Sequence, residues 1–174
     1  MLFADIVGFT GLSEDRDPEQ VKNLVDSCFA RLADDITSFG GRVDKVVGDA
    51  IVALFGAPIA HEDDAERAVR AALRMQETVG RLDVDDGVGI RLRIGINTGD
   101  VIVGNMGSDR KLSYTVLGEP VNLAQRLESN APPGGILISQ RTYDLIAERI
   151  PAERLEPILV KGIDTPIQVY RVPV

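Results

Sequence analysis

The order in which strand-like and helix-like apolar patterns follow one another limits the possible folds of this chain most. An apolar strand-like run around residues 3–7 comes first, and from Val21 to Phe39 the apolar residues recur at helical spacing. Two short apolar runs follow at 43–47 and 50–55, joined through Gly48-Asp49. That dipeptide suits a two-residue hairpin turn. The first third of the chain is therefore predicted as strand, helix and β-hairpin.

The next segment continues the alternation. A helix is predicted from about Glu62 to Val79, and the polar stretch 83–89 is predicted as a loop. The alternating run 90–96 predicts a strand, and the turn at 97–100 predicts a second hairpin with the strand 101–103. The order strand, helix, strand, strand, helix, strand indicates an α+β fold. We expect a ferredoxin-like βαββαβ core with a largely antiparallel sheet and helices on one face.

The last third completes the count of elements and shows no internal repeat or linker. We expect a charged loop at 109–111, a helix that begins at Pro120 and ends near 132–135, a strand at 136–138, a short helix at 140–146, and strands near 155–160 and 167–172. A chain of 174 residues with 44% hydrophobic content is enough for one core. We expect residues 1–174 to form one domain.

Composition excludes several classes of protein. A net charge of −8 argues against a nucleic-acid-binding surface, which needs clustered Lys and Arg. The longest apolar stretches are too short for membrane insertion, and no signal peptide is recognisable, so we expect a cytoplasmic domain. The single cysteine, Cys28, falls on the apolar stripe of the first helix and is predicted to be a buried thiol.

Two aspartates stand beside a glycine at the ends of predicted apolar strands. Taken singly, Asp5 and Asp49 are typical of turn residues that hydrogen-bond their own backbone. On adjacent central strands, however, their like charges would repel unless cations lay between them. No G-x-G-x-x-G or P-loop motif is present to hold phosphates. The pair therefore predicts a site for Mg²⁺ or Mn²⁺.

A second group of polar residues lies on the third helix. Asn122, Gln125, Arg126 and Ser129 share one stripe that contains no acid, which fits an anionic ligand about as well as a solvated face. Lys45 points to the same side of its strand as Asp49, and an ion pair with Asp44 or with another acid across the sheet is the favoured explanation for it. Lys161 is equally ambiguous, and His61 is interpreted as structural.

Four motifs occur in a fixed order across nearly the whole chain. They are Phe3-Ala4-Asp5-Ile6-Val7-Gly8-Phe9-Thr10, Lys45-x-x-Gly48-Asp49, Gly95-Ile96-Asn97-Thr98-Gly99 and Val121-Asn122-Leu123-Ala124-Gln125-Arg126. Together they resemble the catalytic domain of the class III nucleotide cyclases, and the bacterial adenylyl cyclases in particular. The resemblance implies a head-to-tail homodimer with two sites at its interface, each built from both chains. The abrupt start of the first strand suggests a catalytic domain cut from a longer protein with regulatory domains.

The resemblance also implies a role for each site residue. Asp5 and Asp49, with the Ile6 carbonyl, would bind two divalent cations, Mg²⁺ or Mn²⁺. The partner chain would present Asn122 to the ribose and Arg126 to the transition state, and Lys161 would contact the triphosphate. The ribose 3′-hydroxyl would then attack the α-phosphate of ATP to give 3′,5′-cyclic AMP and pyrophosphate without a protein nucleophile.

Base choice depends on Lys45 and Thr115, which match the two base-reading positions of the family. A lysine donates and a hydroxyl can accept, which suits N1 and the 6-amino group of adenine, whereas guanine would require an acid at position 45. ATP is therefore the predicted substrate. Two departures are Thr115, where some members carry Asp, and Asp100, where some place a phosphate-contacting Arg. The alternatives are a guanylyl cyclase and a nucleotide-binding regulatory module with little activity.

Overall fold

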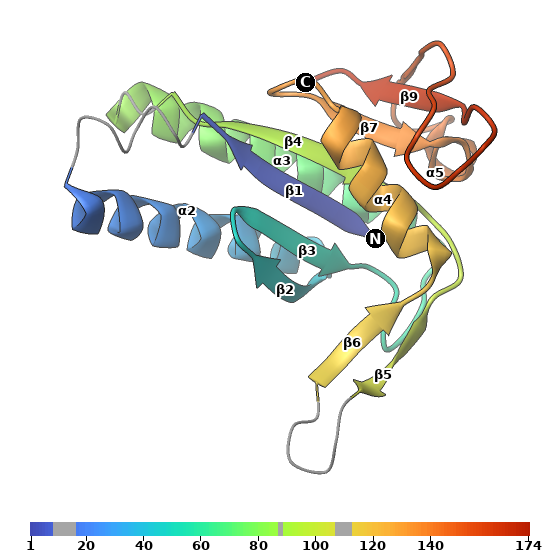
Figure 1. Ribbon diagram of the computed structural model, residues 1–174, viewed down its shortest axis with the longest axis horizontal. Helices are drawn as coiled ribbons and strands as arrows, with labels where there is room; N and C mark the ends of the chain where they lie inside the picture. Colours follow the sequence, from blue (N-terminus) through green and yellow to red (C-terminus); the bar gives the residue numbers. More distant parts are fainter. Residues whose placement is uncertain (9–16, 87–88, 107–112) are drawn as a thin grey trace.

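A computed structural model describes residues 1–8, 17–86, 89–106 and 113–174 (Figure 1). The larger sheet contains β1 (Leu2–Val7), β2 (Arg42–Val47), β3 (Ala50–Leu54), β4 (Arg91–Ile96), β7 (Ile136–Ser139), β8 (Glu153–Arg154) and β9 (Val169–Val172). The smaller sheet contains β5 (Ile102–Met106) and β6 (Ser113–Leu117). The helices are α2 (Pro18–Ser38), α3 (Asp64–Asp86), α4 (Glu119–Asn130) and α5 (Gln140–Ile146).

The strand order of the larger sheet is β2-β3-β1-β4-β7-β9-β8. Its first four strands and the helices α2 and α3 form a βαββαβ unit, in which β1 pairs antiparallel with both β3 and β4. Strand β7 adds parallel to β4, and β9 then pairs antiparallel with β7. The predicted ferredoxin-like core with a largely antiparallel sheet is confirmed.

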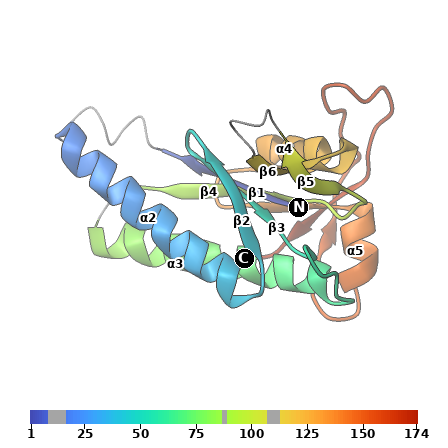
Figure 2. The same cartoon turned by 90° about the horizontal axis from the view of Figure 1, so that it is seen from below.

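The two faces of the sheet are covered differently. Helices α2 and α3 pack on one face, and α4 lies on the other (Figure 2). Because side chains alternate along a strand, Leu2 and Ala4 join the core under α2 and α3, whereas Phe3 packs in the cluster that contains Ala124 of α4. Asp5 continues the face of Phe3. The candidate site residues on β1 therefore lie on the α4 side.

The first helix is formed as its sequence predicts. Asp17 caps it by accepting a hydrogen bond from the Glu19 N–H at 2.8 Å, and Pro18 occupies the first turn. Cys28 is fully buried, as predicted, and burial raises the pKa of its thiol to about 11. The described helices include none that is long and apolar enough to cross a membrane.

Two boundaries differ from the sequence prediction. The loop expected at 83–89 is helical as far as Asp86, because buried Val79 and Leu82 continue the apolar stripe of α3. The strand expected at 155–160 is reduced to one bridge between Ile158 and Ile167, and β8 is formed by residues 153–154 instead. The charged loop expected at 109–111 lies outside the described residues.

The hairpin expected across residues 90–103 is wrong. Both edges of β4 are occupied, by β1 on one side and β7 on the other, so the strand that follows has no place beside it. After Ile96 the chain leaves the larger sheet, and β5 pairs with β6 instead. The β5–β6 arm projects away from the larger sheet beyond the start of α4 (Figure 1).

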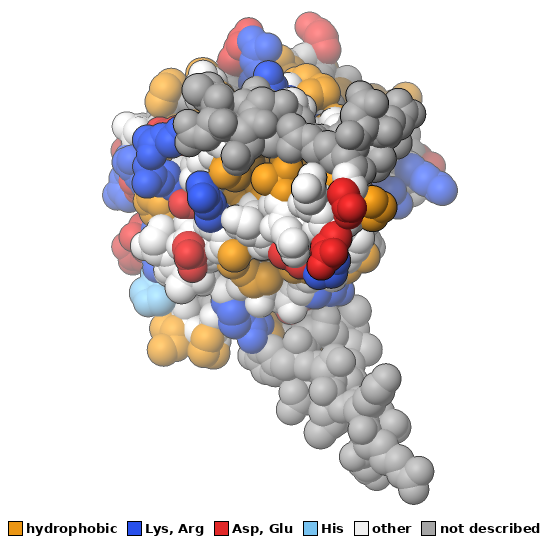
Figure 3. Space-filling view, turned by 90° about the vertical axis from the view of Figure 1, so that its left-hand side faces the viewer, with side chains coloured by type: hydrophobic (Ala, Val, Ile, Leu, Met, Phe, Trp, Pro, Cys, Tyr) orange, Lys and Arg blue, Asp and Glu red, His pale blue; other side chains and the backbone are white. Residues whose placement is uncertain are grey.

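Figure 3 shows one end of the molecule, where acidic and basic side chains are interspersed with apolar ones. The net charge of −8 is therefore not gathered in a single patch on the described part of this face.

Candidate active site

The register of the sheet brings Asp5 and Asp49 to the same end of the central strands. Asp5 lies opposite Ala50, the residue after Asp49, and the Ile6 N–H donates to the Asp49 carbonyl at 3.0 Å. Asp49 is exposed in the β2–β3 turn, where Gly48 adopts a φ of 59°. Asp5 is half-buried. The predicted neighbourhood of the two aspartates is present in the backbone.

These two aspartates fit hard divalent cations by the chemistry of their donors. Carboxylate and carbonyl oxygens are the ligands that Mg²⁺ and Mn²⁺ prefer. In the described part of the chain no group of three or more His, Cys, Asp or Glu side chains forms a metal cage. Asp5 and Asp49 would therefore share bound cations with oxygens from outside the chain, and phosphate oxygens suit that position.

Asp5 also has a protein partner that the sequence did not reveal. Arg93 lies directly opposite Asp5 on β4, and its Nη2 donates to Asp5 Oδ2 at 2.6 Å. The Nε atom of the same guanidinium lies 3.4 Å from Oε1 of Glu128 on α4. Burial raises the pKa of Glu128 above its ordinary value, the Asp5 carboxylate raises it further, and Arg93 opposes both effects.

Close packing of α4 on β4 makes this cluster possible. A side-chain carbon on Gly95 would lie 2.1 Å from the Glu128 nitrogen and 2.3 Å from the Ala124 carbonyl oxygen. Only glycine permits such an approach. Gly95, two residues after Arg93, is a sequence signal of a close contact at this strand. The fold alone shows that α4 is the helix that makes the contact.

A cavity of about 450 Å³ lies between the sheet and α4. Apolar side chains, including Phe3 and Val52, line it together with the polar groups of Lys45, Asn122, Gln125 and Glu128. An apolar wall with a few polar groups suits a flat, partly polar ligand such as a nucleobase.

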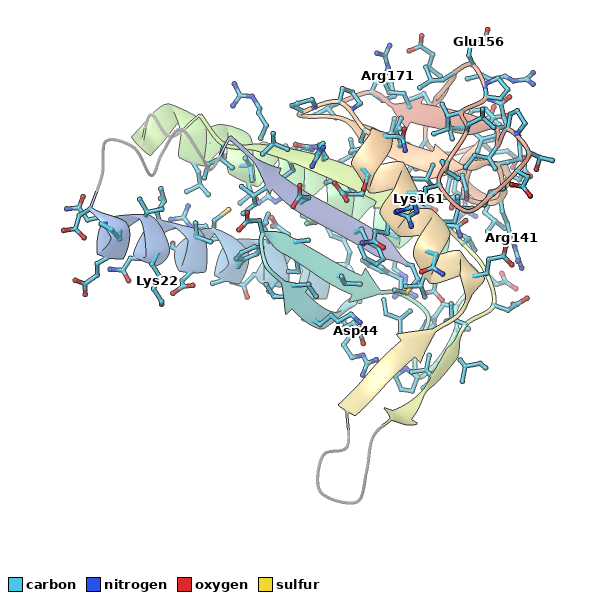
Figure 4. The ribbon with its side chains drawn as sticks, viewed as in Figure 1. Lys22, Asp44, Arg141, Glu156, Lys161 and Arg171 are labelled. Carbon is cyan, nitrogen blue, oxygen red and sulfur yellow. The ribbon has the colours of Figure 1, made fainter. Side chains whose placement is uncertain are left out.

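A β-bulge sets the position of Lys45 in this cavity. The register shifts between Val43 and Lys45, so that Lys45 lies opposite Val52. Among the described residues Lys45 forms no ion pair, so the pairing favoured from the sequence, with Asp44 or with another acid across the sheet, is absent. Figure 4 shows Asp44 on β2. The lysine ammonium therefore remains available to a ligand.

A second cavity, of about 220 Å³, brings Asn122, Arg126 and Lys161 together with Gly162. Figure 4 shows Lys161 beside α4, on the loop before β9. The Nε atom of Arg126 is buried and has no hydrogen-bond partner in the described structure. An unpaired buried guanidinium donor beside a lysine is suited to an anion.

The polar stripe predicted on α4 is present. Asn122, Gln125 and Ser129 are exposed, whereas Ala124 and Leu127 are buried. Asn122 lines both cavities, so α4 forms part of the wall of each.

Four residues singled out from the sequence stand apart from these groups. Asp5 and Asp49 line neither cavity, and Asp100 is exposed, with its nearest cation the Arg141 guanidinium at 3.9 Å. Thr115 pairs with Gly104 in the β5–β6 arm. Asp5 and Asp49 therefore do not share a cavity with Lys45, Arg126 or Lys161 within a single chain.

The fold and this arrangement define a nucleotide cyclase catalytic domain. The family model described as "Adenylate and Guanylate cyclase catalytic domain" matches residues 1–172, so the chain belongs to this family. The structure of the adenylyl cyclase CyaB from P. aeruginosa is 37% identical with a TM-score of 0.95, covering 99% of this chain and 92% of that one. The guanylyl cyclase Cya2 is 38% identical with a TM-score of 0.90, covering 98% and 89%.

Curated relatives are longer than this chain. Adenylate cyclase 1 of Rhizobium meliloti is 30% identical over 98% of this chain, which spans 27% of that protein. The adenylate cyclase of Anabaena cylindrica is 31% identical over 99% of this chain, which spans 36% of it. In both relatives most of the protein lies outside the region that this chain matches.

Proposed function

We propose that this domain is an adenylyl cyclase that converts ATP to 3′,5′-cyclic AMP and pyrophosphate at two sites shared across a head-to-tail homodimer. The observation that carries the proposal is the division of the candidate site. One chain holds a base-sized cavity and an anion-binding cavity on either side of Asn122, while its Asp5 and Asp49 lie outside both. Each half is complete only beside the opposite half of a second copy.

Exposed apolar residues near the two halves support the dimer. Val46 and Val47 at the end of β2 are 50% and 58% exposed, and Ile102 on the β5–β6 arm is 75% exposed. Apolar residues left open around a polar site are typical of surfaces that pair with another protein. In the proposed dimer these residues surround the joined site.

Lys45 favours ATP over GTP. Similarity does not separate the two substrates, because CyaB and Cya2 are matched at 37% and 38% identity. An ammonium group without an ion pair can donate to N1 of adenine, whereas N1 of guanine carries a hydrogen and would oppose it. Thr115 would complete base recognition from the β5–β6 arm.

The remaining residues act by positioning and charge. Two divalent cations held by Asp5, Asp49 and the Ile6 carbonyl would supply charge neutralisation at the phosphates and acidify the ribose 3′-hydroxyl. Asn122 would orient the ribose so that its 3′-oxygen faces the α-phosphorus. The 3′-oxygen forms the new bond to phosphorus, the bond to the β-phosphate oxygen breaks, and the hydroxyl proton passes to solvent.

Arg126 and Lys161 would stabilise the negative charge of this reaction. The planar guanidinium of Arg126 can bind two phosphate oxygens at once, and its unpaired Nε leaves a donor for that purpose. Lys161 would hold the β- and γ-phosphates, which depart as pyrophosphate.

The deciding experiment measures cyclic AMP formed from ATP and Mn²⁺ over a range of protein concentrations. A shared site predicts that specific activity rises with protein concentration as dimers form. The Asp49→Ala variant should fold but lack this activity. Nucleotide binding without product at any concentration would overturn the proposal in favour of a regulatory nucleotide-binding module. A higher kcat/KM for GTP than for ATP would overturn the base assignment and indicate a guanylyl cyclase.

A further inference from the structure

Gln125 is a polar residue of the cavity between the sheet and α4, and the proposed reaction gives it no part. It lies on α4 one turn after Asn122, and both side chains line this cavity together with Lys45. The main-chain carbonyl of Gln125 accepts from the Ser129 hydroxyl at 3.1 Å, whereas its side-chain amide makes no hydrogen bond among the described residues. The side chain is exposed, so the amide is open to a ligand.

The other polar side chains of α4 in this cavity are accounted for. Glu128 lies 3.4 Å from the Nε atom of Arg93, and its Oε2 accepts from the Ser129 hydroxyl at 3.3 Å. Asn122 orients the ribose in the proposed site. Because residues one turn apart on a helix lie side by side, Gln125 is next to the group that the ribose carries, which is the base.

A glutamine amide matches one edge of adenine with both of its polar groups. N7 of adenine accepts a hydrogen bond and the 6-amino group donates one, while the glutamine amide donates from its nitrogen and accepts at its oxygen. In guanine both N7 and O6 are acceptors, so the glutamine oxygen would face O6 with no hydrogen between them. Adenine alone satisfies both groups of the amide.

We propose that Gln125 is a specificity-determining residue that binds N7 and the 6-amino group of adenine, alongside Lys45 at N1. The inference rests on the proposed function, because it takes this cavity to be the base site. The 6-amino group carries two hydrogens, so that Gln125 can accept one and Thr115 the other. Discrimination against guanine then depends on α4 as well as on β2.

The test compares ATP with 7-deaza-ATP, in which a C–H group replaces N7 and the rest of the nucleotide is unchanged. The unaltered domain should cyclise 7-deaza-ATP with a kcat/KM about three- to tenfold lower than that for ATP, because one hydrogen bond to the base is lost. Gln125→Met keeps a long, helix-favouring side chain but removes both polar groups. It should lower kcat/KM for ATP by about 5- to 30-fold, and it should use the two nucleotides within about twofold of each other.

A second variant exchanges the edge that position 125 reads. A guanidinium donates to both N7 and O6 of guanine, so Gln125→Arg should raise the ratio of kcat/KM for GTP to that for ATP by about three- to tenfold. An unchanged or lower ratio would contradict the proposal. Gln20→Met is the matched control, because Gln20 is exposed on α2 and lines neither cavity. It should change neither kcat/KM for ATP nor the preference for ATP over 7-deaza-ATP.

The outcomes distinguish this inference from the proposed function. If the domain cyclises no nucleotide, or prefers GTP, the proposed function or its base assignment fails and the role of Gln125 fails with it. If ATP is preferred but 7-deaza-ATP is used equally well, or if Gln125→Met keeps the full preference for ATP over 7-deaza-ATP, only the role of Gln125 is refuted. Circular dichroism checks the folding of each variant.

Discussion

At the scale of single residues, a side chain of this domain acquires its role from the partner that the fold places beside it. Asp5 and Asp49 were predicted as a pair because each ends a strand beside a glycine, a pattern visible within a few residues of sequence. Arg93 and Glu128 were missed, because their link to Asp5 depends on the β1–β4 register and on the packing of α4. Short-range patterns identify candidate ligands, whereas their counter-ions depend on tertiary structure.

Lys45 allows a test of base recognition at this scale. Replacing it with glutamate should lower kcat/KM for ATP and raise it for GTP, because a carboxylate accepts from N1–H of guanine and offers nothing to N1 of adenine. Exchanging a matched hydrogen bond to the base for a mismatch should change the ratio of the two values by about 10- to 100-fold. Steady-state kinetics with both nucleotides measure it.

The control for that change is Lys22→Glu. Lys22 lies exposed on α2, where it pairs with Asp26, and Figure 4 shows it pointing away from the sheet. It alters the net charge as Lys45→Glu does, but it should leave the ATP to GTP ratio unchanged. A ratio that moves equally in both variants would show a general charge effect and remove Lys45 from base recognition.

At the scale of elements, the sequence predicts well whether a segment is a helix or a strand. It predicts less well which strands pair with one another. The alternating residues after Ile90 gave β4 correctly, yet its expected hairpin partner is wrong because β1 and β7 occupy both edges. Neither neighbour is close in sequence. Helix α3 extends into the segment expected as a loop because Leu82 is buried. The helical spacing between Val79 and Leu82 is a local pattern that already indicates this extension.

The contact between β4 and α4 gives the prediction at this scale. Gly95→Ala should destabilise the domain by about 3 kcal/mol and abolish turnover, because backbone atoms of α4 at 2.1 and 2.3 Å leave no room for a methyl group. Helix α4 would have to move away from the sheet, carrying Asn122 and Arg126 with it. Urea denaturation measures the free energy of unfolding.

Gly80→Ala is the matched control. Gly80 lies within α3, and a side-chain carbon there meets no atom within 4 Å. The same substitution should stabilise the protein by roughly 0.5–1 kcal/mol, since alanine loses less conformational freedom in a helix. Equal stability of the two variants would mean that α4 does not rest on Gly95 as the structure has it.

At the scale of the whole molecule, the candidate site residues of one chain fall into two groups. Asp5 and Asp49 occupy one part, while Lys45, Asn122, Arg126 and Lys161 surround the two cavities of the other. In the proposed two-fold symmetric dimer, the first part of each chain would meet the second part of its partner, and two sites would form at once. No single sequence motif contains this separation of the two groups.

Mixing two inactive variants tests that division directly. Asp49→Ala and Arg126→Ala chains should each be inactive alone, but a heterodimer would contain one site with an intact aspartate from one chain and an intact arginine from the other. Random pairing makes half of the dimers mixed, each with one working site of two, so activity should recover to about one quarter of the unaltered level. Cyclic AMP formation after mixing and dilution measures it.

The matching control combines Asp5→Ala with Asp49→Ala. Both aspartates belong to the same part of one chain, so every site in such a heterodimer lacks one of them and the mixture should stay inactive. Recovery in both mixtures would indicate that the changes were not confined to the site. No recovery from Asp49→Ala with Arg126→Ala, in chains shown to heterodimerise, would mean that one chain supplies both groups to its own site. Asp5 and Asp49 would then have to approach the residues of the two cavities within a single chain.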